Sequence, residues 1–127
     1  MSLNKVLIVD DSVEIYELLK RVMELYEIDT DYAENGEKAL ELIRYGEYDF
    51  IFLDLIMPRM YGVEVLKELK KMNKQKTPKI VLMTGCVADE LIKETMELGV
   101  KMLLNKPFEI GDVAEILNPV YAVKMAV

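Results

Sequence analysis

The chain has 127 residues and carries 16 basic and 23 acidic side chains, which gives a net charge of −7. Its composition, 52% hydrophobic and 31% charged, suits a single domain spanning residues 1–127 with a buried core. The acidic surplus argues against direct binding to nucleic acid or to an anionic membrane surface, because both need a basic footprint on the protein. No apolar run approaches the roughly 18 residues of a transmembrane helix.

Histidine is absent, and Cys86 is the only cysteine. The first fact excludes histidine as a general base, metal ligand or phosphoryl carrier within this chain. The second excludes an internal disulfide and fits a reducing compartment. Because the residues before the first expected strand are too few to form a signal peptide, we expect a cytoplasmic protein.

Short apolar runs alternate with segments of helical periodicity along the chain. The pattern predicts strands at residues 5–9, 29–33, 50–53, 78–83 and 100–104, the second of them weak and at an edge. It predicts helices at residues 12–26, 37–44, 63–72, 88–98 and 110–117, with Pro119 kinking or ending the last one. The Asn35-Gly36 pair could close a hairpin, but the helical spacing after it favours a strand-to-helix turn.

Five strands with doubly buried character, alternating with five helices, indicate an α/β fold with a parallel sheet and helices on both faces. In such a sheet the carboxyl ends of the strands lie along one edge, where ligands bind. Polar residues fall at these ends: Asp10 and Asp11 after the first strand, Asp54 at the third, Thr84 at the fourth and Lys106 after the fifth. We therefore expect these side chains to meet in one cleft.

The chemistry of this set of side chains is specific. Three close carboxylates repel one another, so they favour a divalent cation, and at least one of them should have a raised pKa without metal. Oxygen ligands with no histidine or cysteine nearby select a hard ion, Mg2+ first. A carboxylate beside Mg2+ can attack a phosphoryl donor to form an acyl phosphate, while the metal and a lysine neutralise the phosphoryl oxygens. The cleft is therefore predicted to be a Mg2+-dependent phosphoryl site.

Each of these residues also has a purely structural interpretation. Asp11 and Glu14 could form a helix capping box, and Asp54 could cap the loop that follows it. Thr84 is an ordinary strand residue, and Lys106 before a proline is an ordinary exposed turn residue. Taken singly, each structural interpretation prevails. Four strand ends that deliver the right groups together favour the functional interpretation.

Five sequence motifs, in order and at matching spacing, resemble those of the receiver domains of bacterial-type two-component response regulators. The motifs occupy residues 6–11, 33–40, 54–62, 83–85 and 106–108, and the resemblance runs from Lys5 to about Leu117. It implies a flavodoxin-like fold of the receiver type, with strand order 2-1-3-4-5. It also implies a phospho-accepting switch that is not a classical enzyme, although it catalyses its own aspartyl phosphorylation and slow dephosphorylation.

The resemblance assigns roles to the residues of the cleft. Asp54 would accept the phosphoryl group. Mg2+ would be held by Asp11, by Asp54 and by the backbone carbonyl of Ile56, with Asp10 acting mostly through a metal-bound water.

Other residues would respond to the phosphoryl group. Thr84 and Lys106 would grip it, and the Lys106–Pro107 bond would be cis. The residue three before the lysine is usually Tyr or Phe in the family and swings inward when the threonine moves. Here it is Leu103, so the usual coupling between Thr84 and an aromatic switch residue is in question, and the signal could instead pass through the loop after Thr84.

The expected partners follow from the same resemblance. A histidine kinase or phosphotransfer protein would donate the phosphoryl group, and the surface of the fourth helix, fifth strand and fifth helix would change its affinity for an output protein, an output domain or a second copy. A phosphate-sink or interaction domain without its own output would carry the same site. A haloacid-dehalogenase-type phosphatase would instead need an Asp-x-Asp arrangement on the first strand.

Three further features lead to expectations. Residues 118–127 are largely apolar, so they should extend the fifth helix after a kink and pack on the domain or a second copy, or else be a truncated linker. The five lysines between Lys70 and Lys79 are interpreted as a solvated helix end and loop. The resemblance implies that the residues two beyond the acceptor and two beyond the threonine flank the attacking water. Here they are Ile56 and Cys86, which would orient a water poorly, so the acyl phosphate should be long-lived.

Overall fold

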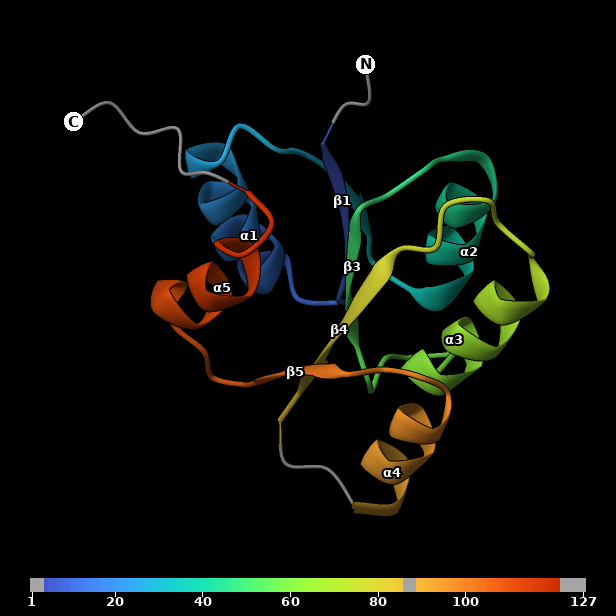
Figure 1. Ribbon diagram of the computed structural model, residues 1–127. Coiled ribbons are helices and arrows are strands. Elements are labelled where there is room, and N and C mark those ends of the chain that lie inside the picture. Colours follow the sequence, from blue (N-terminus) through green and yellow to red (C-terminus); the bar gives the residue numbers. More distant parts are fainter. Residues whose placement is uncertain (1–3, 86–88, 122–127) are drawn as a thin grey trace.

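The computed structural model describes residues 4–85 and 89–121, and strands and helices alternate along it (Figure 1). The strands are β1 Lys5–Val9, β2 Asp29–Ala33, β3 Phe50–Asp54, β4 Lys79–Thr84 and β5 Met102–Asn105. The helices are α1 Val13–Leu25, α2 Gly36–Tyr45, α3 Gly62–Lys71, α4 Asp89–Glu97 and α5 Ile110–Leu117. The bounds agree with those predicted to within one or two residues nearly throughout.

The five strands form one parallel sheet in the order β2-β1-β3-β4-β5, as predicted. The register places Val9 beside Leu53 and Asp54 beside Met83, so neighbouring strands end at the same edge. The expected double burial holds for β1, β3 and β4 but is wrong for β2 and β5. These two are the edge strands, and each pairs with only one neighbouring strand, so part of each stays exposed.

The sheet separates two hydrophobic cores, because successive side chains of a strand point to opposite faces. In β3, Phe50 and Phe52 enter the core covered by α1 and α5, whereas Ile51 and Leu53 enter the core covered by α2, α3 and α4 (Figure 1). All five residues of β3 are buried. The last residue of this strand is therefore fixed from both sides.

The start of α1 differs from the capping box of Asp11 and Glu14 that the sequence suggested. Ser12, not Asp11, is the N-cap, and its hydroxyl oxygen accepts from the backbone N–H of Ile15 at 3.3 Å. The capping box of Asp11 with Glu14 is thus wrong, and the Asp11 carboxylate does not serve as the cap.

The connection from α4 to β5 also differs from expectation. The strand was expected to begin at Val100, but it begins at Met102. The N–H groups of Gly99 and Val100 instead donate to carbonyls in the last turn of α4, those of Met96 and Thr95. Gly99 has a positive φ of 97°, the left-handed conformation that commonly ends a helix.

The fifth helix ends at Leu117, and the next residues form a turn in which Val120 and Tyr121 both donate to the Leu117 carbonyl. The helix is therefore interrupted at Pro119, as expected, because proline has no N–H to donate. Tyr121 nevertheless packs on the domain, with 8% of its surface exposed and its ring centroid 5.9 Å from that of Phe50. The rest of the predicted tail, residues 122–127, lies outside the described residues.

Among the helices in the described ranges, none has the length and apolar character needed to cross a membrane.

Candidate functional site

Three carboxylates meet at the carboxyl edge of the sheet. Asp10 and Asp11 directly follow β1, and Asp54 ends the neighbouring β3. One oxygen from each lies within 4.8 Å of the others. Asp10 is fully buried and Asp54 is 6% exposed, whereas Asp11 is exposed at the mouth of the cleft. The predicted convergence of these three residues is confirmed.

Lys106 reaches the same cleft from the loop after β5. Its Nζ donates to Asp10 Oδ2 at 2.6 Å and lies 3.5 Å from Asp54 Oδ2. The backbone N–H of Lys106 donates to the Thr84 carbonyl at 2.6 Å, which ties this loop to the end of β4. The Lys106–Pro107 bond is cis, as predicted.

The surroundings of Asp54 disfavour its charged form. Burial first, then the negative charge of Asp10 and to a smaller extent that of Asp11, raise the pKa of Asp54, and the net value is about 6. The Lys106 amine and the Ile56 N–H, which donates to Asp54 Oδ1 at 3.4 Å, act in the opposite direction. The expectation that one carboxyl of the trio has a raised pKa is therefore confirmed.

Thr84 is the last residue of β4 and is 1% exposed. Its hydroxyl donates to the Gly85 carbonyl at 3.3 Å. Thr84 lies one residue beyond Met83, the partner of Asp54 in the sheet register, so it belongs to the same edge. Leu103 lies on β5 with 37% of its surface exposed. Cys86 lies outside the described residues.

The sequence profile of the response regulator receiver domain matches residues 6–118. The chain belongs to this family. Receivers are signalling domains, not classical enzymes. The phosphatase alternative is set aside because the family match includes residues of all five strands and every site residue from Asp10 to Lys106.

Curated relatives of this receiver include sporulation initiation phosphotransferase F of Bacillus subtilis, 33% identical over 87% of this chain and 88% of the relative. The transcriptional regulatory protein YdfI of the same organism is 42% identical over 82% of this chain. A CpxR homolog of Haemophilus influenzae, also a transcriptional regulatory protein, is 35% identical over 84% of this chain. The receiver spans about half the length of these last two relatives, 48% and 45%.

Solved structures agree with the fold of the receiver. The chemotaxis protein CheY4 of Vibrio cholerae superposes with a TM-score of 0.84 at 28% identity, over 94% of this chain and 99% of that one. The receiver domain of the Francisella response regulator 1452 gives a TM-score of 0.79 at 33% identity, over 91% of this chain and 94% of that one.

The donor set in the cleft of the receiver fits a hard divalent cation. Three carboxylates and one ammonium group leave an excess of negative charge, and all the candidate ligand atoms are oxygens. Asp11 and Asp54 could offer oxygens directly, and Asp10 is engaged by Lys106. The acidic cluster can therefore hold a metal ion.

Sequence reasoning missed Tyr32. This residue of β2 donates its hydroxyl to the Asp10 backbone carbonyl at 2.8 Å. Burial, followed by the negative charge of Asp10, raises the pKa of Tyr32 above its usual value, so the hydroxyl keeps its proton at neutral pH. A side-chain bond to a distant backbone carbonyl leaves no spacing signal in the sequence, so the pattern could not have revealed it.

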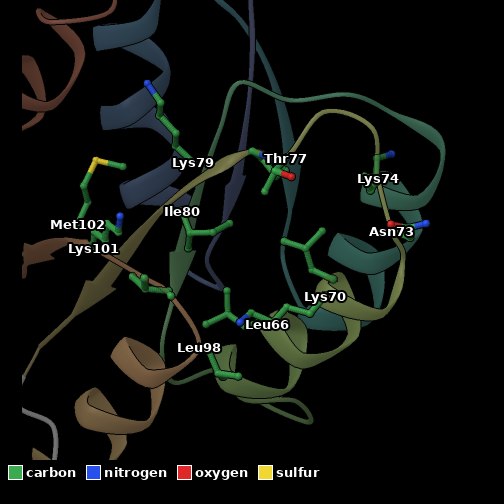
Figure 2. Close-up of a pocket in the computed structure, with 14 residues that line it drawn as sticks. Leu66, Lys70, Asn73, Lys74, Thr77, Lys79, Ile80, Leu98, Lys101 and Met102 are labelled. Carbon is green, nitrogen blue, oxygen red and sulfur yellow. The ribbon is translucent and has the colours of Figure 1, made fainter.

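A cavity of about 490 Å³ opens at the opposite edge of the sheet, between α3, α4 and the starts of β4 and β5 (Figure 2). Two of its lysines contact other parts of the chain. Lys74 donates to the carbonyls of Ile43 and Gly46 near the end of α2. Lys79 lies 5.6 Å from the Phe50 ring and extends away from the cavity (Figure 2). The interpretation of this stretch as a solvated helix end and loop holds for the exposed Lys70, Lys71 and Lys79 but not for Lys74, which is bound to backbone carbonyls.

Proposed function

We propose that this receiver is a phospho-accepting switch in which Asp54 takes a phosphoryl group from a histidine kinase or phosphotransfer protein, with Mg2+ as cofactor. One observation carries the proposal: Asp54 ends the central strand within 4.8 Å of two further carboxylates, with the Lys106 amine 3.5 Å from its oxygen. Residues 1–127 would form one receiver domain that acts in the cytoplasm.

The chemistry assigned to the residues is in-line displacement at phosphorus. An Asp54 carboxylate oxygen forms the new bond to phosphorus as the bond to the donor nitrogen breaks, and the imidazole leaves with the electron pair. Lys106 and Thr84 bind the phosphoryl oxygens and neutralise their charge. Mg2+, held by Asp11, Asp54 and the Ile56 carbonyl and by Asp10 through water, would supply further charge neutralisation.

The signal would pass from the phosphoryl group to the surface of α4, β5 and α5. Thr84 lies at the end of β4 and is joined to the loop after β5 by the Lys106 N–H. Movement of the Thr84 hydroxyl toward a phosphoryl oxygen would therefore act on β5, where Leu103 replaces the aromatic residue usual in the family. An output protein, an output domain or a second copy would bind the changed surface, and the acidic net charge of −7 disfavours direct binding to nucleic acid.

The test is phosphorylation by acetyl phosphate and Mg2+, followed by intact mass. The wild type should gain one phosphoryl group, and Asp54→Ala should gain none. Asp29→Ala, which removes an exposed carboxylate at the opposite edge of the sheet, should behave as the wild type. An equal yield of labile phosphoryl group on Asp54→Ala would show that the acceptor is another residue.

A receiver without its own output would carry the same site. NMR spectra of the phosphorylated chain distinguish the two cases, because only a switch should show shift changes that extend from the cleft into α4, β5 and α5. Changes confined to the cleft would favour a phosphate sink.

A further inference from the structure

The backbone that joins Asp10 to Asp11 is held by an edge strand that lies outside the acidic cluster. β1 ends at Val9, and Asp10 continues toward the cleft. The Asp10 N–H donates to the Ala33 carbonyl at 3.2 Å, and the Asp10 carbonyl accepts from the Tyr32 hydroxyl at 2.8 Å. Both contacts come from the end of β2.

The three carboxylates differ in how they are fixed. The Asp10 side chain accepts from the Ser12 N–H at 2.8 Å and from Lys106 at 2.6 Å, and the Asp54 side chain accepts from the Ile56 N–H. Within residues 4–85 and 89–121, no side-chain hydrogen bond or ion pair holds the Asp11 carboxylate. Its position is therefore set by its backbone.

The peptide unit before Asp11 includes the carbonyl that Tyr32 binds. Because a peptide unit is planar, fixing its carbonyl oxygen also fixes the orientation of the N–H that leads into Asp11. The Tyr32 ring is itself held in place: it stacks on Tyr16 of α1 with centroids 4.2 Å apart and an interplanar angle of 17°. The Lys20 amine lies 5.9 Å from the Tyr16 ring on this helix. The hydroxyl thus comes from a packed and directed side chain.

We propose that Tyr32 is a positioning residue for the metal site, and that its hydrogen bond to the Asp10 carbonyl holds the Asp11 carboxylate where a divalent cation can bind. The inference rests on the proposed function, because it needs Mg2+ to bind in this cleft. Substitution of groups that orient metal ligands from outside the coordination sphere typically lowers metal affinity by about tenfold to a hundredfold.

The test is Mg2+ titration of 15N-labelled protein, followed by backbone amide shifts, which gives a dissociation constant for folded protein alone. Tyr32→Phe keeps the stacked ring and removes only the hydroxyl, and it should raise the dissociation constant by about tenfold. The matched control is Tyr48→Phe, which removes the hydroxyl that donates to Asp31 Oδ2 at 2.7 Å; Asp31 precedes Tyr32 on β2 and points to the other face of the sheet. Tyr48→Phe should change the Mg2+ dissociation constant by less than about twofold, even if it lowers the stability of the chain to urea unfolding.

A double-mutant cycle separates positioning from general loosening. In the Asp11→Asn background, adding Tyr32→Phe should leave the remaining Mg2+ affinity unchanged, because the carboxylate it positions is already gone. Should Tyr32→Phe fail to fold, Tyr16→Leu removes the supporting ring, keeps the hydroxyl and should give a smaller loss that also disappears in Asp11→Asn.

The outcomes are distinguishable. No Mg2+ binding by the wild type would overturn the proposed function together with the inference. Binding by the wild type that Tyr32→Phe leaves unchanged, or that Tyr48→Phe weakens equally, would overturn the inference alone. An equal loss from Tyr32→Phe with and without the Asp11 carboxylate would do the same.

Discussion

At the scale of single residues, the raised pKa of Asp54 predicts a pH-dependent stability of the metal-free chain. A carboxyl whose pKa is higher in the folded state contributes stability below its unfolded value, and this is lost as the pH rises through the folded value. For Asp54 this stability is lost as the pH rises from about the usual pKa of 3.8 to the folded-state pKa of about 6. The free energy of unfolding in EDTA should therefore fall by about 1–3 kcal/mol between about pH 4 and pH 7.5.

The measurement is urea unfolding of the wild type and Asp54→Asn at both pH values. The asparagine variant has no carboxyl to ionise, so its advantage over the wild type should appear at the higher pH and shrink at the lower one. An advantage that does not vary with pH would contradict this assignment. Added Mg2+ should reduce the stability advantage of Asp54→Asn over the wild type, because the ion stabilises only the folded wild type.

Ile56 bears on the lifetime of the acyl phosphate. Its side chain is 48% exposed two residues beyond Asp54, and it cannot hydrogen-bond a water that attacks phosphorus. Ile56→Asn should speed loss of the phosphoryl group by about tenfold, which corresponds to about 1.4 kcal/mol of barrier. The rate is followed by intact mass after donor removal, in Mg2+ and without kinase.

The control is Val120→Asn, whose side chain is 46% exposed at the other end of the sheet. This variant should lose its phosphoryl group at the wild-type rate. Slower loss from Ile56→Asn than from the wild type would refute the argument.

At the scale of elements, the start of α3 is pressed against the end of β3. A Cβ added at Gly62 would lie 2.7 Å from the Asp54 backbone oxygen and 3.1 Å from the Leu55 Cα, so the backbone would have to move. Gly62→Ala should therefore destabilise the chain by about 1–3 kcal/mol and weaken Mg2+ binding.

Gly111 is the matched control, because it too lies near the start of a helix and a Cβ there meets no atom within 4 Å in the described structure. Gly111→Ala should be neutral or stabilise the chain by up to about 1 kcal/mol through reduced backbone entropy. Urea unfolding measures both variants. Similar changes in unfolding free energy for the two substitutions would show that the close contact at Gly62 does not restrict the residue at this position.

The elements themselves were largely readable from the sequence, because the buried strands carry unbroken apolar runs and the helices carry a regular apolar face. What the pattern could not show is how hydrogen bonds end each element. Val100 looks like a strand residue by its hydrophobicity, but its N–H closes the last turn of α4. Ser12 takes the cap because its hydroxyl reaches Ile15, which leaves Asp11 for the cleft. The convergence of the carboxylates followed from strand order, whereas the contact of Tyr32 depends on three-dimensional distance alone.

At the scale of the whole molecule, the last described residues join the amino edge of the sheet. The Tyr121 hydroxyl donates to Asp49 Oδ2 at 2.7 Å, and Lys76 pairs with the other oxygen of the same carboxylate. Burial alone would raise the pKa of Asp49, but the hydrogen bonds from Lys76 and Tyr121 outweigh it and lower the pKa. Truncation after Asn118 removes Tyr121 and should cost about 2 kcal/mol of unfolding free energy at neutral pH.

Truncation after Tyr121 is the control, and it should retain that stability. The gap between the two truncations should narrow as the pH falls through the lowered pKa of Asp49, because a protonated carboxyl no longer contributes its paired charge. Thermal melts and light scattering measure stability and oligomeric state. Identical melts for both truncations would show that Tyr121 is dispensable.

The complete burial of β3 also bears on how receivers diverge. The first four residues of this strand fill one core or the other, and the last residue is Asp54. Substitutions within the strand would therefore disturb both the packing of the cores and the position of Asp54. Freedom to vary lies instead with the exposed rim of the cleft, at Val13, Ile56 and Tyr61, whose side chains are 48–58% exposed. Under the proposed function, a phosphoryl donor would meet this rim as it approaches Asp54, so exchanging these side chains should change donor preference while β3 stays unchanged.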